Sequence, residues 1–149
     1  MAEGVFTQLT TLLNKNTFKT RLRELAIMRI GWVTGSEYEW TQHWRVATTA
    51  EIPPDDILAV RDWRHSDRLT DADRAVLQAT DEMIESGKIS DDTWTECCRH
   101  VPAPAEQVEM VVCIANWIMF SNLLRPLEIP VEDGVASWPP DGKKPGTAD

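Results

Sequence analysis

The spacing of apolar positions predicts a chain built from α-helices. In the segment 20–32, apolar residues recur at helical intervals on more than one face, so this helix should be buried on several sides. A second helix is expected over 36–48, and others should begin near Pro53, Thr70 and Ser90. No run of alternating β-branched residues lies between hairpin turns. We therefore predict an all-α fold, a single-domain helical bundle.

Start and stop signals recur along the chain. Ser36 and Glu39 match a capping box, in which the serine hydroxyl accepts from the third helical amide and the glutamate reaches back. Thr70 and Asp73 repeat the pattern, and Gly87 is suited to end the helix that follows them. These signals predict where two of the helices begin and where one ends.

The segment 105–124 is apolar around nearly its whole circumference, so this helix must be buried. We expect it to be central to the fold and partly covered by a partner subunit, because that much exposed apolar surface favours aggregation. Beyond Pro130 the composition shifts to Gly, Pro, Lys and Asp. The predicted organisation is an N-terminal arm (1–16), one helical domain (17–131) and a C-terminal tail (132–149).

Composition and charge exclude several classes of partner. The 149 residues suit one domain, and 24 acidic against 15 basic residues give a formal charge of −9, which repels nucleic acid and anionic membrane surfaces. No stretch reaches the ~18 uncharged apolar residues of a membrane span, and no signal peptide is recognisable. Three cysteines do not make a secreted disulfide framework. We expect a cytoplasmic protein that binds neither nucleic acid nor membrane.

Four polar residues stand at a distinctive spacing: Glu24, then Ser36 twelve residues later, Glu39 after three more and His43 after four more. Together with the blocks 22–27 and 121–131, this spacing resembles the carboxymuconolactone decarboxylase and alkyl hydroperoxidase D family over about residues 18–131. In the peroxidase branch, the positions of Ser36 and Glu39 are the cysteines of a Cys-x-x-Cys-x-x-x-His motif.

The resemblance implies a compact helical fold whose helix pair around Glu24 and His43 forms the active-site pocket, and assembly into trimers or hexamers. It implies no cofactor. It also implies a choice of chemistry: the peroxidase members exchange disulfides with a relay through the glutamate and histidine, whereas the decarboxylase members act on a lactone carboxylate. Because this chain lacks the two cysteines, disulfide exchange is not expected. Only the proton relay through the glutamate and the histidine is expected here.

The favoured interpretation is a lyase or isomerase that acts on a small carbonyl or carboxylate compound. An imidazole can take or give a proton near neutral pH, so His43 is the expected general acid/base, with Glu24 orienting it. Tyr38 is expected to donate a hydrogen bond to the developing oxyanion. Further residues are expected to bind the substrate: Ser36, Glu39, Trp40, Asn116 and Trp117.

Structural explanations compete for several of these residues. Ser36 can be explained by helix capping alone, and Glu39 points either at the imidazole or back at the cap. Glu24 could instead pair with Arg21 within its own helix. Glu39 and His43 could hold a metal ion, but two ligands fall short of the three or four that a zinc site needs, and none is expected.

Two other functions are open. The chain could be a non-catalytic oligomeric protein that binds small molecules and has lost the reactive thiols of its relatives. Thiol peroxidase activity is disfavoured, because a serine and a glutamate cannot cycle through a disulfide.

Overall fold

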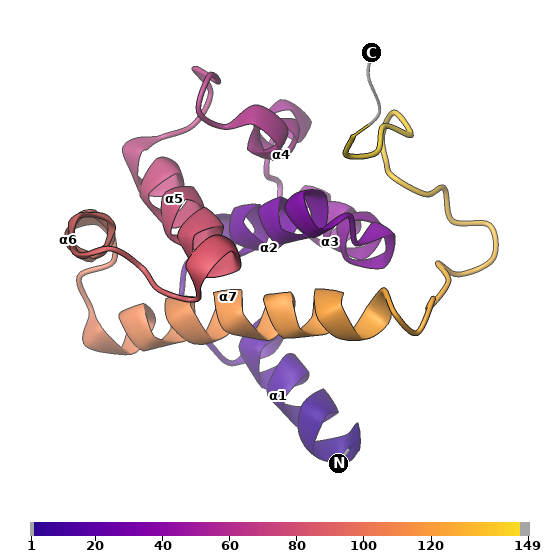
Figure 1. Cartoon of the computed structure of the whole chain (residues 1–149), viewed down its shortest axis with the longest axis horizontal. Helices are drawn as coiled ribbons and strands as arrows, with labels where there is room; N and C mark the ends of the chain where they lie inside the picture. Colours follow the sequence, from indigo (N-terminus) through magenta and orange to yellow (C-terminus); the bar gives the residue numbers. More distant parts are fainter. Residues whose placement is uncertain (1, 147–149) are drawn as a thin grey trace.

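The computed structural model describes residues 2–146, which form helices and irregular segments with no β-strand (Figure 1). This confirms the all-α prediction. The elements in chain order are α1 (Ala2–Asn14), α2 (Thr20–Thr34), α3 (Glu37–Thr49), α4 (Pro54–Ala59), the 3-10 helix η1 (Val60–Asp62), α5 (Asp71–Ser86), α6 (Asp91–His100) and α7 (Pro104–Leu124).

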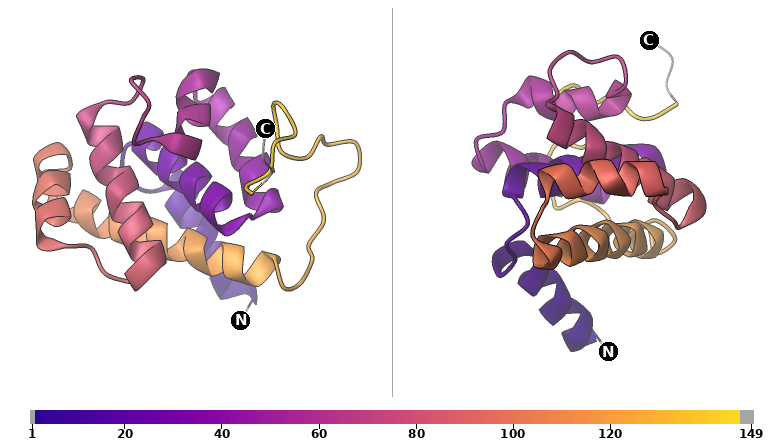
Figure 2. Two further views of the ribbon diagram at one scale, coloured as in Figure 1. Left: turned by 45° about the horizontal axis from the view of Figure 1, so that its top comes forward. Right: turned by 90° about the vertical axis from the view of Figure 1, so that its left-hand side faces the viewer.

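Helix α2 lies at the centre of the molecule, with α3, α5 and α7 packed around it (Figures 1 and 2). One set of its apolar residues joins a core cluster with α1, α5, α6 and α7, and another joins a cluster with α3, α4 and η1. Burial on both sides explains why the segment has apolar residues on more than one face. The central helix is therefore α2, and not the apolar segment 105–124.

A close approach of α3 to α2 sets the geometry of the site. Gly35 ends α2 in the left-handed conformation, with φ of 68°, and turns the chain directly into α3. A Cβ atom on Gly31 would lie 3.1 Å from the backbone nitrogen of Trp40, closer than side-chain carbons normally come. A glycine at 31 thus lets the two helices approach closely enough for their buried polar side chains to meet.

The two predicted capping boxes have different outcomes. At the start of α5, the Thr70 hydroxyl accepts from the amide of Asp73 and the Asp73 carboxylate accepts from the amide of Thr70, as predicted. At the start of α3, Ser36 is the N-cap residue, but its side chain makes no capping hydrogen bond. The second prediction is wrong, because the Glu39 side chain turns inward to other partners.

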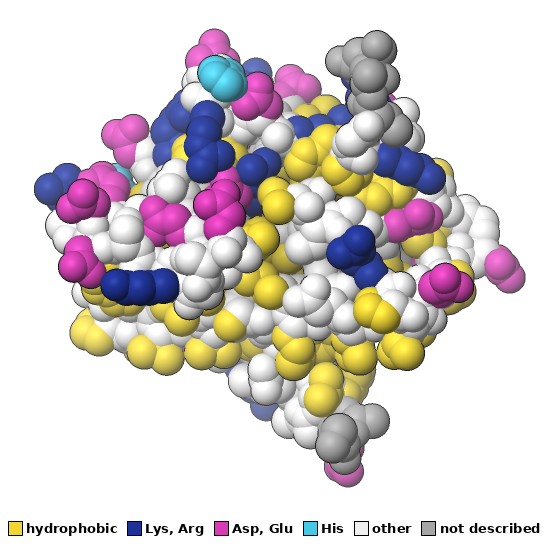
Figure 3. All heavy atoms as spheres, viewed as in Figure 1, with side chains coloured by type: hydrophobic (Ala, Val, Ile, Leu, Met, Phe, Trp, Pro, Cys, Tyr) yellow, Lys and Arg dark blue, Asp and Glu magenta, His cyan; other side chains and the backbone are white. Residues whose placement is uncertain are grey.

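Helix α7 buries only one face against the other helices. Its opposite face exposes Val108, Val112, Met119 and Leu123, and Figure 3 shows apolar side chains along the edge that α7 occupies. Among the described residues, α7 is the one helix that is long and apolar enough to cross a membrane, although core helices of soluble proteins pass the same test. Coverage of this face by a partner subunit stays a prediction.

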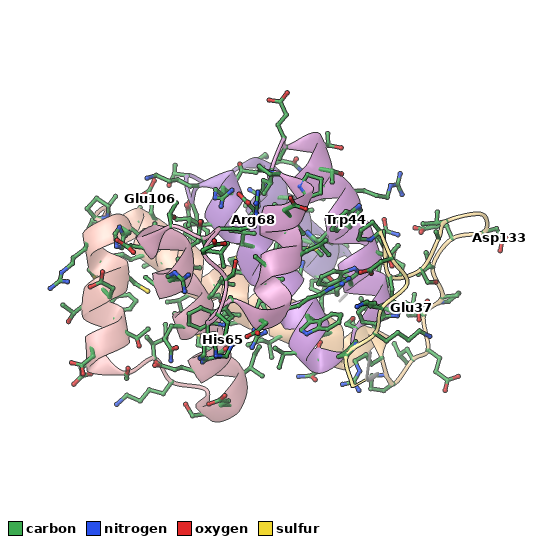
Figure 4. The ribbon with its side chains drawn as sticks, turned by 90° about the horizontal axis from the view of Figure 1, so that it is seen from above. Glu37, Trp44, His65, Arg68, Glu106 and Asp133 are labelled. Atoms are coloured by element: carbon green, nitrogen blue, oxygen red, sulfur yellow. The ribbon has the colours of Figure 1, made fainter. Side chains whose placement is uncertain are left out.

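The first helix and the described part of the last segment pack against the helical domain. The segment predicted as an arm forms α1, which contributes the buried Leu12 to the core. The described part of the predicted tail runs outward to Asp133 and returns toward Glu37 (Figure 4). It buries the indole of Trp138, and Asp141 accepts two hydrogen bonds from the guanidinium of Arg61. We refer to residues 129–146 as the C-terminal strap.

Candidate functional site

A buried carboxylate and an imidazole form the centre of the site. Nδ1 of His43, on α3, lies 2.7 Å from Oε2 of Glu24, on α2. The other carboxylate oxygen of Glu24 accepts from Nε of Arg23 at 2.9 Å. Burial by itself would raise the pKa of Glu24, but the hydrogen bonds and electrostatic effects of His43 and Arg23 outweigh it and lower that pKa. Glu24 is therefore held as a buried carboxylate, as the prediction of an orienting acid requires.

The second nitrogen of His43 is also engaged. The indole N–H of Trp117, on α7, donates to Nε2 at 2.8 Å, and the two rings meet edge to face with centroids 5.4 Å apart. An indole nitrogen can only donate, so Nε2 must accept. The imidazole then carries its proton on Nδ1, where it donates to Glu24. Both the orientation and the tautomer of His43 are fixed by these two partners.

Glu39 lies one helical turn before His43 and points into the same region. Its Oε2 is 3.6 Å from Nε2 of His43. Burial raises the pKa of Glu39, while the electrostatic effect of the neighbouring imidazole and a hydrogen bond from Trp117 oppose that rise without cancelling it. The pKa values of the two glutamates beside His43 are thus shifted in opposite directions. That of Glu24 is lowered, so Glu24 stays ionised, and that of Glu39 is raised, so Glu39 is easier to protonate.

A cavity of about 390 Å³ lies beside this group. Helices α1, α3 and α7 and the start of the strap surround it. The residues that line it are Leu9, Leu13, Tyr38, Glu39, Gln42, His43, Val46, Trp117, Phe120, Leu124 and Ile129. Most of these are apolar, and neither Lys nor Arg is among them. The wall of the cavity is therefore mostly apolar. It includes one carboxyl group with a raised pKa and no cationic side chain that could pair with an anion. We call it the acid cavity.

Tyr38 lines the acid cavity, but its hydroxyl lies at the rim. That hydroxyl donates to Oε1 of Glu132 in the strap at 3.4 Å, and Nε2 of Gln42 donates to Oε2 of the same carboxylate at 2.5 Å. Burial and the nearby negative charge of Glu132 raise the pKa of Tyr38, which keeps its hydroxyl protonated. The strap thus holds two polar side chains of the cavity wall.

Of the residues predicted to bind substrate, Glu39 and Trp117 lie at the acid cavity, whereas Ser36, Trp40 and Asn116 do not line it. The Ser36 hydroxyl is buried without a hydrogen-bond partner among the described residues. Trp40 is buried among other tryptophans and donates from Nε1 to the carbonyl of Pro139 at 2.7 Å. Asn116 accepts from Gln8 at 2.8 Å. Ser36 lines a separate hollow of about 360 Å³. The substrate-binding roles of these three residues stay predictions that the acid cavity does not support.

The alternative pairing of Glu24 with Arg21 is also wrong. The guanidinium of Arg21 instead binds Asp73 and Asp56, which lie on α5 and α4. Arg21 therefore connects α2 to α4 and α5, and it does not compete with His43 for the carboxylate of Glu24.

Several cavity residues were not predicted. Gln42 lies one turn after Tyr38 and one turn before Val46, and this spacing could have indicated a shared face. The contributions of Leu9 and Leu13 could not be inferred, because nothing in the sequence shows which face of α2, α3 or α7 the first helix covers.

Thiol and metal chemistry find little support in the arrangement. Burial raises the pKa of Cys97 to about 12 and also raises that of Cys113, so neither thiol is activated as a thiolate. Neither lines the acid cavity. Within the described range, no three His, Cys, Asp or Glu side chains are grouped so that they could hold a metal ion.

The chain belongs to the carboxymuconolactone decarboxylase family, whose sequence model matches residues 3–82. This confirms the family resemblance and extends it through α1. A comparison with curated proteins gave no match.

Solved structures share the fold. A protein of unknown function from Agrobacterium tumefaciens, a putative antioxidant defence protein AhpD, is 20% identical with a TM-score of 0.79, over 88% of this chain and 91% of that one. A variant of the debrominase Bmp8 in complex with 2,3,4-tribromopyrrole is 16% identical with a TM-score of 0.76, over 89% and 71%. An uncharacterized peroxidase-related protein from Silicibacter sp. TM1040 is 11% identical with a TM-score of 0.78, over 89% and 71%. At these identities the likeness shows the fold alone.

Proposed function

We propose that the protein is a cofactor-independent lyase or isomerase that transfers a proton to or from a small carbonyl compound in the acid cavity. The observation that carries the proposal is the Glu39 carboxyl group, buried in an apolar wall 3.6 Å from His43. A carboxyl group in such surroundings has a pKa closer to neutral pH, where it can act as both acid and base.

Glu39, rather than His43, is the group that meets the substrate. Nε2 of His43 already accepts from Trp117, so its lone pair is occupied on the cavity side. His43 lies 3.6 Å from Glu39, and Glu24 holds the imidazole from behind. The interpretation of His43 as the acid/base is thereby revised: Glu39 is the acid/base, and His43 and Glu24 are positioning residues behind it.

The proposed step conserves protons and electrons. The Glu39 carboxylate removes a proton from the carbon next to the carbonyl, and the electron pair of the broken C–H bond moves onto the carbonyl oxygen as an enolate. Return of the proton to a different carbon gives an isomer. In the lyase direction, the Glu39 carboxylate takes the proton of a β-hydroxyl group, and the carbon–carbon bond breaks to release an aldehyde or ketone and leave the enolate. Protonated Glu39 then delivers that proton to the enolate carbon. Gln42 is the side-chain donor at the cavity wall for the enolate oxygen, because its amide has a second N–H besides the one given to Glu132. The single O–H of Tyr38 is already given to Glu132.

The reacting end of the substrate should be a neutral carbonyl and not a carboxylate. A carboxylate in the acid cavity would lose its hydration without gaining a cationic partner, which costs several kcal/mol. It would also lie near two glutamates. Of the two substrate types that the sequence left open, the cavity favours the carbonyl compound.

Deuterium exchange tests the proposal without knowledge of the natural substrate. A panel of small cyclic ketones and lactones in D2O, followed by proton NMR, should contain compounds whose α-hydrogens exchange faster with the protein than without it. Glu39→Gln should reduce that exchange by about 10²-fold or more. Glu96→Gln, an exposed glutamate on α6, is the matched control and should exchange normally. Exchange that persists unchanged in Glu39→Gln would overturn the assignment.

A non-catalytic binding protein is the second candidate, and one observation favours it. Both nitrogens of His43 are satisfied by Glu24 and Trp117, as expected for a structural histidine. In that case members of the panel would bind, none would exchange, and Glu39→Gln would leave their affinities unchanged.

A further inference from the structure

A second hollow adjoins the acid cavity. It has a volume of about 560 Å³ and lies between α1, the start of α2 and the second half of α3. Leu13, Gln42 and Val46 line both hollows. The two spaces are therefore adjacent along α3, and we refer to them together as one groove, with Glu39 and His43 at one end.

The far end of this groove carries positive charge. Arg23 and Arg45 line it together with Asn14, Thr20 and Thr49, and no Asp or Glu is among its lining residues. This contrasts with the acid cavity, which no Lys or Arg lines. We call this end the arginine groove.

Arg45 is exposed and is not neutralised by a direct partner. Most arginines of this acidic chain pair with carboxylates, as Arg29 does with Asp81 and Arg61 with Asp141. Within residues 2–146, no hydrogen bond or ion pair joins the Arg45 guanidinium to another side chain, although its charge lowers the pKa of Glu132. A guanidinium with free donors at the end of an apolar groove is suited to a carboxylate or phosphate.

The separation of the two ends sets the length of the ligand. Glu39 and Arg45 are six residues apart on α3, which corresponds to about 9 Å along the helix axis. Leu13 and Val46 line both hollows and give them a shared apolar wall, so an apolar body can bridge the two ends.

We propose that the arginine groove binds an anionic group, a carboxylate or a phosphate monoester, at the end of the substrate remote from its reacting carbonyl. This inference rests on the proposed function and defines its substrate class: an elongated molecule with a neutral carbonyl, an apolar middle and an anionic tail. Arg45 is the principal contact. Arg23 also lines the groove, but its charge is paired with Glu24, so the tail lies close to the pair of Glu24 and His43.

Binding of simple amphiphiles tests the groove independently of turnover. Octanoate, octyl phosphate and the neutral 1-octanol would be titrated into the full chain by isothermal calorimetry. At least one anion should bind about tenfold tighter than 1-octanol, as expected for a hydrogen-bonded charge contact. The two anions distinguish a carboxylate site from a phosphate site. The preference should weaken with added salt.

Arg45→Gln should abolish the preference for the anion and leave 1-octanol binding unchanged. Arg99→Gln removes the same charge from an exposed pair on α6 and is the control. Equal affinities for the three amphiphiles, or an unchanged preference in Arg45→Gln, would overturn the inference. Glu39→Gln should retain the preference, so that a failure of catalysis and a failure of this binding site give different results.

Discussion

The indole N–H of Trp117 donates to Nε2 of His43 at 2.8 Å, and this bond occupies the imidazole nitrogen nearest to Glu39. Because the imidazole is held by Trp117 on one side and by Glu24 on the other, the proposed function assigns proton transfer to Glu39. The same bond spans α3 and α7, so it also contributes to the packing of the fold.

Trp117→Phe should destabilise the protein by about 1–3 kcal/mol, because it leaves Nε2 of His43 buried without a donor. Urea unfolding measures this loss. Trp94→Phe changes a tryptophan at the surface of α6 and should have little effect. Equal stabilities for the two variants would show that the Trp117 bond does not contribute to folding.

Glu24→Gln should cost more, about 3–5 kcal/mol, because it leaves the buried guanidinium of Arg23 without its counter-charge. The amide oxygen can still accept from His43, so the fold around the imidazole is preserved. Chemical denaturation compares this variant with Glu96→Gln, which breaks an exposed pair and should change stability by less than about 1 kcal/mol. A loss no greater than that of the control would contradict the assignment of Glu24 as a buried ion-pair partner.

The raised pKa of Glu39 predicts a pH-dependent difference in stability. A folded protein that holds this proton more tightly than the unfolded chain becomes less stable as pH rises from about 4.5, the ordinary value, through the folded pKa. Glu39→Gln cannot ionise and should avoid that loss. Its free energy of unfolding relative to wild type should therefore increase between pH 4.5 and pH 8.

The opposite sign applies to Glu24, whose lowered pKa gives stability that is present above about 4.5 and lost as pH falls through the folded value. Wild type and Glu39→Gln share this loss of stability at low pH, so it cancels when their free energies of unfolding are compared. A difference that stays flat across the pH range would show that Glu39 is not perturbed by burial.

Trp138→Ala should release the C-terminal strap. Trp138 is 3% exposed, and its indole packs against Trp32 and Trp40. Its backbone has a φ of 53°, which is unfavourable for a residue with a side chain, so the packing of the indole holds it there. Without it, residues 132–146 should exchange their amide hydrogens faster and be cleaved sooner by protease. Trp94→Ala is the control. Unchanged protection of these residues would mean that other contacts, such as Arg61 with Asp141, suffice.

The helices could be predicted because their signals are local. Gly87 ends α5 in the left-handed conformation, and the capping box of Thr70 and Asp73 forms as written in the sequence. The corresponding pattern at Ser36 and Glu39 does not form a capping box, because the glutamate interacts with a buried histidine and tryptophan instead. A local pattern cannot reveal a partner from a distant helix.

The pairing of Glu24 with His43 followed from the family resemblance, but the shape of the cavity did not follow from the sequence. Trp40 and Trp117 were both expected as walls, and only Trp117 lines the cavity. The rotation of each helix about its axis determines such outcomes, and that rotation depends on the packing of the whole core. For the same reason, α7 could be recognised as apolar but its exposed face could not be located.

The close approach that Gly31 permits between α2 and α3 has a consequence for how this protein can diversify. The Glu24, Glu39 and His43 side chains come from two helices locked together within residues 20–49, whereas Leu9, Leu13 and Ile129 belong to the first helix and the last segment. Substitutions in those two segments can therefore change part of the cavity wall without disturbing the buried acid–imidazole pair. That part of the wall is free to evolve at a different rate from α2 and α3.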